Sequence, residues 1–135
     1  MAYDALVIDG LEPLGQYSQA TITAPGRLLH IAGQVSMDAD TVLGVGDPDA
    51  QAAQVIERLG RVLSAAGASW SDVCLVRAYA TSLDAARAFA RARRDVLREP
   101  PPASTVLIVA GLIHPDLVIE AEATAALDGQ GDRHG

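Results

Sequence analysis

The sequence predicts an α+β fold in which a β-sheet carries two helices packed on one face. Apolar residues follow helical spacing in the segments 47–67 and 83–97, and several shorter apolar segments have the composition of strands. The 135 residues are enough for one domain with a substantial core and too few for two. Because two helices cover only one face of such a sheet, we expect the other face to pack against another copy of the chain.

Both helices have recognisable ends. In the first, Asp47 can cap the helix, Pro48 fits its first turn and Gly67 supplies the stop. Its apolar positions form one stripe that we expect to be buried: Ala52, Val55, Ile56, Leu59, Val62, Leu63 and Ala66. The second helix, 83–97, ends before the prolines at 100–102, which cannot continue a helix. The residues that it is expected to bury are Leu83, Ala86, Phe89, Ala90, Val96 and Leu97.

The strands are recognised as short apolar runs bounded by turn residues. They are predicted at 20–24, 28–32, 73–81, 105–110 and 117–126. Turn signals occur at Pro25-Gly26 and at His114-Pro115-Asp116. These elements place a single domain over residues 1–127. A polar, glycine-rich tail follows at 128–135, and we expect it to be flexible.

The charge and composition exclude several classes of function. A formal charge of −7 and a pI of about 4.7 disfavour binding to nucleic acid or to anionic membranes. The chain has no lysine, so neither a lysine Schiff base nor a Walker-type phosphate loop can form. No apolar stretch of the sequence approaches the roughly 20 residues that span a bilayer. We therefore expect a soluble, cytoplasmic protein.

Most of the other reactive side chains favour structural roles. Cys74 lies in the apolar run 73–76, which favours a buried structural thiol over a nucleophile. None of the three histidines has metal-ligand spacing, so neither a metal nor another cofactor is expected. His30 is a possible site residue, although a hydrogen-bonded structural role is favoured. The second helix carries arginines that we expect to be solvated or paired with acidic neighbours: Arg87, Arg91, Arg94 and Arg98.

Two glutamates occur inside the last apolar strand. Because strand side chains alternate between faces, Glu120 and Glu122 share one face, while Ile119, Ala121 and Ala123 pack on the other. Ionised carboxylates rarely enter a sheet unless a partner, a hydrogen-bond network or a ligand compensates for the lost water. The alternative to a functional site is the polar outer face of an edge strand, and this segment alone leaves both open.

Several motifs, taken in chain order, resemble one family. They are Gly15-Gln16-Tyr17-Ser18-Gln19-Ala20, Leu28-Leu29-His30-Ile31-Ala32-Gly33-Gln34, Gln51 with Leu63-x-x-x-Gly67, Pro102-Ala103-Ser104-Thr105, and Val118-Ile119-Glu120-Ala121-Glu122-Ala123. Over residues 14–126 the chain resembles the Rid (reactive intermediate deaminase, YjgF-like) family. The resemblance implies a chorismate-mutase-like α+β fold and a homotrimer with ligand clefts between neighbouring subunits. It also implies cofactor-free hydrolysis of small imines or enamines to a ketone or aldehyde and ammonia.

The resemblance further implies the residues of the site. Tyr17 matches the family's cleft tyrosine, and Glu120 matches the cleft glutamate that handles protons or positions water. Gly33 matches the turn whose backbone lines the site. The remaining substrate-binding positions depart from the family, with Ala32 in place of a serine, Ala90 of an asparagine, Ser104 of the substrate-carboxylate arginine and Val106 of a cysteine.

The serine at position 104 implies an atypical branch of the family. An arginine can hold a carboxylate with charge-assisted hydrogen bonds worth roughly 1.5–3 kcal/mol, whereas a serine donates one neutral hydrogen bond. We therefore expect a small and less acidic imine or enamine as the substrate. Two alternatives stay open: another proton transfer that depends on Glu120, such as tautomerisation or cyclisation, or a non-catalytic trimer that binds a small metabolite.

Overall fold

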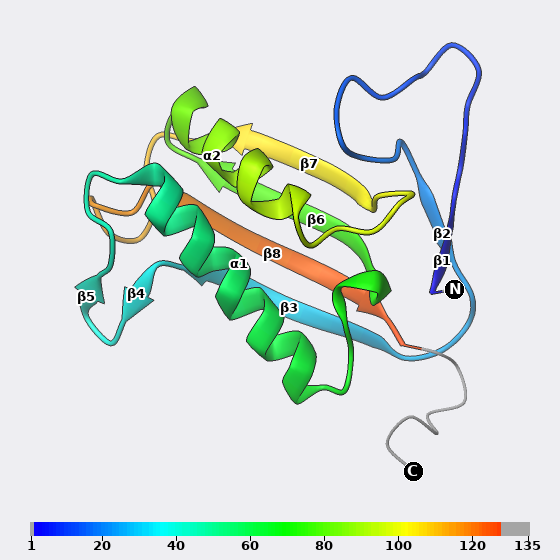
Figure 1. Cartoon of the computed structure of the whole chain (residues 1–135), viewed down its shortest axis with the longest axis horizontal. Coiled ribbons are helices and arrows are strands. Elements are labelled where there is room, and N and C mark those ends of the chain that lie inside the picture. Colours follow the sequence, from blue (N-terminus) through cyan, green and yellow to red (C-terminus); the bar gives the residue numbers. More distant parts are fainter. Residues whose placement is uncertain (1, 128–135) are drawn as a thin grey trace.

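The computed structural model describes residues 2–127 (Figure 1). The tail predicted at 128–135, which includes His134, lies outside the described residues. A four-stranded sheet is covered on one face by two helices, which confirms the predicted α+β class (Figure 1). The order of its strands is β3 (Leu28–Val35), β8 (Ile119–Ala126), β6 (Val73–Ala80) and β7 (Ala103–Ile108). Only the β6–β7 pair in this sheet is parallel.

Two small antiparallel pairs flank this sheet. In the first, β1 (Tyr3–Ala5) pairs with β2 (Thr21–Thr23). In the second, β4 (Met37–Asp38) pairs with β5 (Thr41–Val42). Neither β1 nor the β4–β5 pair was expected from the sequence, because strands of two or three residues carry too little periodicity. The predicted strand 28–32 is also too short, since β3 continues to Val35 through an irregularity in its pairing with β8.

The first helix, α1 (Pro48–Ala65), matches its prediction closely. Asp47 caps it by accepting a hydrogen bond from the Ala50 amide at 3.0 Å, and Gly67 follows its end in the left-handed region at φ +73°. The expected apolar stripe is buried at Ala52, Val55, Leu59 and Leu63, with Ile56 and Val62 partly buried against the core. A short 3₁₀ helix, η1 (Trp70–Asp72), connects this part of the chain to β6.

The second helix, α2 (Leu83–Arg94), is shorter than predicted and buries a different face. Leu83 is 61% exposed and Ala90 is exposed, so the expectation that both are buried is wrong. The residues of α2 that are buried are Ala85, Ala88, Phe89 and Arg93. Leu83, at the first position of α2, lies outside the stripe that Ala85, Ala88 and Phe89 bury. A buried arginine is invisible to a pattern that counts only apolar residues.

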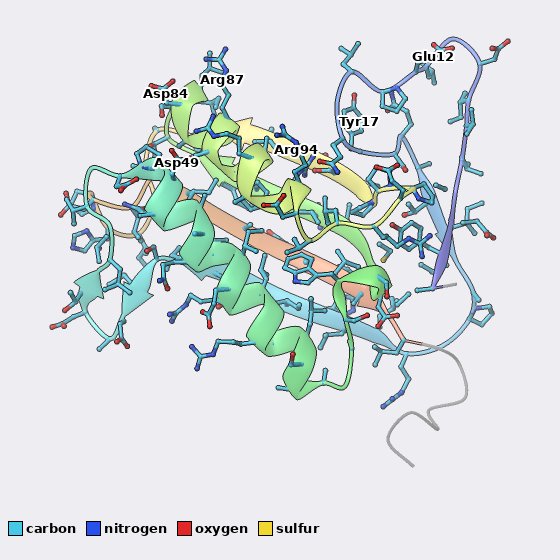
Figure 2. The ribbon with its side chains drawn as sticks, in the orientation of Figure 1. Glu12, Tyr17, Asp49, Asp84, Arg87 and Arg94 are labelled. Atoms are coloured by element: carbon cyan, nitrogen blue, oxygen red, sulfur yellow. The ribbon has the colours of Figure 1, made fainter. Side chains whose placement is uncertain are left out.

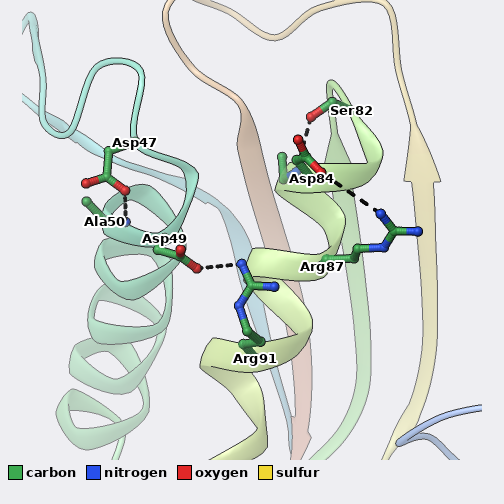
Figure 3. A network of polar contacts seen from close by, with 8 residues as sticks. Asp47, Asp49, Ala50, Ser82, Asp84, Arg87 and Arg91 are labelled. Carbon is green, nitrogen blue, oxygen red and sulfur yellow. Dashed lines mark hydrogen bonds and ion pairs between the residues drawn. The ribbon is translucent and has the colours of Figure 1, made fainter.

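The exposed arginines of α2 behave partly as expected. Arg91 pairs with Asp49 of α1 at 2.8 Å, and Arg87 pairs with Asp84 at 4.0 Å (Figure 3). The prediction that arginines of this face reach acidic neighbours is therefore confirmed for these two. Such exposed pairs typically contribute less than about 1 kcal/mol each. Within the described residues, neither helix is long and apolar enough to cross a membrane.

Cys74 lies inside the protein, as its sequence context predicts. Its side chain is buried, and Sγ donates a hydrogen bond to the carbonyl oxygen of Thr124 at 3.3 Å. Burial also raises the pKa of the Cys74 thiol, which disfavours the reactive thiolate.

The side chain of Gln51 joins the first turn of α1 to the chain just before β8 by hydrogen bonds. Its side chain is 0% exposed. Nε2 donates to the carbonyl oxygens of Asp116 at 2.8 Å and Gly44 at 3.2 Å, and Oε1 accepts from the Val118 amide at 3.0 Å. One amide thus satisfies three backbone groups, and buried backbone groups without partners are costly.

Replacing this amide is expected to destabilise the protein strongly. The Gln51→Leu variant keeps a similar side-chain volume but leaves three backbone groups without their partner, so the free energy of unfolding should fall by about 3 kcal/mol. Urea denaturation measures this change. Gln54→Leu, on the same helix at a half-buried position, is the matched control and should change stability by less than about 0.5 kcal/mol. Equal losses in the two variants would contradict the role given to Gln51.

Candidate functional site

Glu120 and Glu122 lie on the face of the sheet that the helices leave uncovered. Their neighbours Ile119, Ala121 and Ala123 are buried on the helix side, as strand alternation predicts. However, β8 lies between β3 and β6, so the alternative of an edge strand is wrong. Two carboxylates therefore lie side by side in the middle of a sheet, and each needs a physical explanation.

Local partners account for Glu122. The Tyr79 hydroxyl donates to Glu122 Oε1 at 2.6 Å, and Arg77 Nη1 lies 3.8 Å from Oε2. The hydrogen bond to Glu122 is the main cause that raises the pKa of Tyr79 above its ordinary value. These contacts tie Glu122 to β6 and give it a structural role.

Glu120 packs against the backbone of β3. A Cβ atom at Gly33 would collide with Glu120 Oε2 and lie 2.8 Å from Cδ. Gly33 falls where the β3–β8 pairing shifts between Ile31 and Gln34, and this irregularity brings the glycine against the carboxylate. The structure therefore brings together Gly33 and Glu120, two of the residues that the sequence assigns to the site.

A hollow of about 350 Å³ opens beside the two glutamates. It is lined by Tyr79, Val109, Gly111, Leu112, Glu120 and Glu122. The carboxylates and the tyrosine lie along one side of it, and the loop after β7 supplies the other lining residues. Among the described residues no group of three or more His, Cys, Asp or Glu side chains could hold a metal ion.

Tyr17 lies on the loop that precedes β2 (Figure 2). Its hydroxyl accepts a hydrogen bond from the Leu14 amide at 3.3 Å. The next residue, Ser18, bridges to Ala103 at the beginning of β7 and donates through Oγ to the Pro101 carbonyl oxygen at 2.5 Å. These contacts place Tyr17 near the beginning of β7.

Ser104 lies on the helix side of the sheet. It pairs with Val76, which is buried under the helices, so the two side chains share a face. The sheet therefore separates Ser104 from Glu120 within one chain. The family resemblance implies that both line one cleft, and a single chain does not bring them together.

Ser104 contacts Arg93, a residue that the sequence pattern did not indicate as part of the site. Arg93 of α2 donates from Nη1 to Ser104 Oγ at 2.6 Å and from Nη2 to the Gln16 carbonyl oxygen at 2.8 Å. Its side chain is 6% exposed and lies over the Phe89 ring at 5.9 Å. Burial lowers the pKa of the Arg93 guanidinium. The only signal in the sequence was helical spacing, which places Arg93 four residues after the buried Phe89.

The other residues assigned from the sequence fall into the same two groups. Ala32 is exposed beside Gly33. His30 is exposed on β3, where it pairs with Thr124 of β8. Val106 shares its face of β7 with Ser104, and Ala90 is exposed on α2. His30 and Ala32 therefore lie on β3 with Gly33, whereas Val106 and Ala90 lie on β7 and α2, the elements that carry Ser104 and Arg93.

Comparison with known proteins identifies the family. A sequence model of the family described as Endoribonuclease L-PSP matches residues 7–127. The crystal structure of YyfB from Yersinia pestis, a protein of the Rid family, is 33% identical, with a TM-score of 0.82 over 94% of this chain and 100% of that one. The chain belongs to the Rid family. Its α+β architecture is the one that the Rid resemblance implied.

Two further relatives match most of the chain. A RutC family protein of Pyrococcus abyssi is 34% identical over 115 residues, which cover 84% of this chain and 88% of the relative. The crystal structure of a putative endoribonuclease from Thermotoga maritima is 30% identical, with a TM-score of 0.68 over 86% of this chain and 90% of that one. The family is thus shown over nearly the whole described domain.

The contact between Gly33 and Glu120 can be tested by a double-mutant cycle. Gly33→Ala should lower the free energy of unfolding by about 1–3 kcal/mol, because the new methyl group must displace the carboxylate. In a Glu120→Ala background the same substitution should cost only a few tenths of a kcal/mol, roughly the limit of additivity. Urea denaturation of the four proteins measures the coupling. Gly60→Ala is the control, since its Cβ would lie 3.4 Å from Trp70 Nε1 and alanine favours a helix.

Proposed function

We propose that the protein is a cofactor-free hydrolase of small imines or enamines, and that it works at clefts completed between the subunits of a homotrimer. The observation that carries the proposal is the position of Glu120. Its carboxylate rests against the Gly33 backbone at the edge of a hollow on the uncovered face. Membership of the Rid family supports the reaction class.

The two glutamates have different roles in this proposal. Glu122 already binds Tyr79 and Arg77, whereas Glu120 faces the hollow next to a backbone without a side chain. Glu120 protonates the imine nitrogen or orients the attacking water. Water adds to the imine carbon, and the resulting carbinolamine expels ammonia to leave a ketone or aldehyde. Tyr17 of a neighbouring subunit donates a hydrogen bond to the substrate or covers it.

The proposed cleft needs more than one chain, because its two groups of residues lie on opposite faces of the sheet. Glu120 lies on the uncovered face, and Ser104 lies on the other. Apolar side chains are exposed along the edge strand β7 and the loop after it, with Leu107 at 50%, Ile108 at 54% and Ile113 at 86%. A second copy that buries these residues against the uncovered face would join the Tyr17–Ser104 group of one subunit to the Glu120 group of the next.

An endoribonuclease, which the family's description suggests, is a weaker assignment for this chain. RNA binding relies on basic surface, and the formal charge here is −7. Two exposed arginines of α2 are already paired with Asp49 and Asp84. The charges that could meet a phosphate backbone are thus partly neutralised.

The reaction can be tested by removing one carboxylate. Glu120→Gln should lower the turnover of a freshly generated small imine by at least about a hundredfold, because general acid–base groups typically contribute 10²–10⁴-fold. Ammonia release is the readout. Glu57→Gln makes the same chemical change at an exposed position of α1 and should leave turnover unchanged. Saturable binding without turnover in the wild type would instead favour a metabolite-binding trimer.

Light scattering tests the assembly on its own. The native protein should have three times the 14.0 kDa mass of one chain. Replacing Leu107 and Ile108 by aspartate should shift it to the monomer, because exposed apolar contacts would become charged. A monomeric wild type under dilute native conditions would refute the proposed cleft.

A further inference from the structure

The loop that carries Tyr17 packs loosely against the rest of the chain. All of residues 9–15 are exposed, and Leu14 is 98% exposed. A hollow of about 180 Å³ is lined by this loop, Tyr17 included, and by the prolines at 100 and 101. Segments with few buried apolar contacts are held weakly by packing. The position of Tyr17 therefore depends mainly on polar contacts.

Polar contacts hold the backbone on both sides of Tyr17. Directly before it, the Gln16 carbonyl oxygen accepts a hydrogen bond from Arg93 Nη2 at 2.8 Å. Directly after it, Ser18 forms a β-bridge with the first residue of β7. Within the part of the chain that the structure describes, the Arg93 contact is the one hydrogen bond that joins residues 7–16 to a distant segment.

Arg93 can fix this loop because its guanidinium binds two segments at once. The guanidinium is planar, and its nitrogens donate in fixed directions. Nη1 donates to Ser104 Oγ on β7 at 2.6 Å while Nη2 donates to Gln16, so one side chain of α2 joins a strand to the loop. The side chain is 6% exposed, and Cζ lies over the Phe89 ring at 5.9 Å from its centroid. Burial thus restrains the group that holds the loop.

Packing alone does not account for a cation at this position. Burying a charge costs free energy unless an opposite charge and hydrogen bonds compensate for the lost water. The partners of Arg93 are a hydroxyl, a carbonyl and an aromatic ring, which are all neutral. An apolar side chain of similar volume would fill the same space at a lower cost. It could not donate to Gln16, and this contact lies next to Tyr17.

We propose that Arg93 is a positioning residue of the reaction and that it acts through Tyr17. Its hydrogen bond to the Gln16 carbonyl fixes the backbone directly before the tyrosine. The ring is therefore already oriented when it meets the substrate in the cleft of a neighbouring subunit. Arg93 itself does not touch the substrate. The inference rests on the proposed function, in which Tyr17 contacts the substrate.

A double-mutant cycle in imine turnover separates positioning from general stability. Arg93→Met keeps an unbranched side chain and should lower kcat/KM by about tenfold to a hundredfold, because small misplacements of a contacting group are this costly. In a Tyr17→Ala background the same substitution should change kcat/KM by less than about twofold, since no ring is left to position. Arg93→Lys keeps a charged donor without the planar fork and should recover part of the loss.

Arg87→Met is the matched control. It removes an arginine from the same helix at a position where the side chain is 68% exposed and pairs with Asp84 of that helix. Turnover should stay unchanged in this variant. Equal losses from Arg93→Met with and without Tyr17 would overturn the inference, and so would an Arg93→Met protein with wild-type turnover.

Fluorine NMR tests the same inference without turnover. The chain has three tyrosines, and fluorotyrosine gives each of them a resonance that a Tyr→Phe variant assigns. Arg93→Met should shift or broaden the Tyr17 resonance. The resonances of Tyr3 and Tyr79 should not change, because their hydroxyls donate to Pro100 and Glu122. An unchanged Tyr17 resonance would contradict positioning, and a change in all three would show that Arg93 only supports the fold.

The two proposals can fail separately. A wild type without imine turnover refutes the proposed hydrolase, and the Tyr17 resonance then decides whether Arg93 orients this tyrosine. Turnover that depends on Glu120 but not on Arg93 refutes the positioning role and leaves the hydrolase standing. If Arg93→Met does not fold, Arg93→Lys replaces it in both measurements, with the same changes expected at a smaller size.

Discussion

The buried side-chain amide of Gln51 holds the chain directly before β8, the strand that carries both glutamates of the candidate site. Gln51 joins α1 to the Asp116 carbonyl and the Val118 amide, directly before the strand. Strand side chains alternate with a period of two, so a shift of one residue would turn Glu120 toward the helices. The pairing of β8 with β3 and β6 keeps this register, and the Gln51 side chain, 0% exposed, supports it at the start of the strand.

The same alternation places the polar residues of the candidate site on two opposite faces of the sheet. Glu120 and Gly33 meet on the uncovered face, while Ser104 faces the helices. Side chains on the two faces of a sheet point away from each other, so the backbone layer separates them. The chain therefore presents two incomplete groups of polar residues, and a repeated copy is the simplest way to join them.

Burial determines how each arginine of α2 affects the stability of the protein. Arg91 and Arg87 lie in water and pair with aspartates, where the contribution to stability is small. Arg93 lies one position from the exposed Arg94, yet it is almost completely buried against neutral partners. Residues of one type on one short helix thus have opposite physical consequences, because the helix turns by about 100° per residue.

The sequence by itself determined the fold class, the span of α1 and the face shared by Glu120 and Glu122, because these follow from local periodicity and capping. It also placed Gly33 and Glu120 in one site, through a family resemblance. Only the tertiary structure decided that β8 is a central strand and that Leu83 is exposed, since both depend on how elements pack. The Arg93–Ser104 contact belongs to this second group. It joins a helix to a strand, and no pattern within either segment encodes the approach of the other.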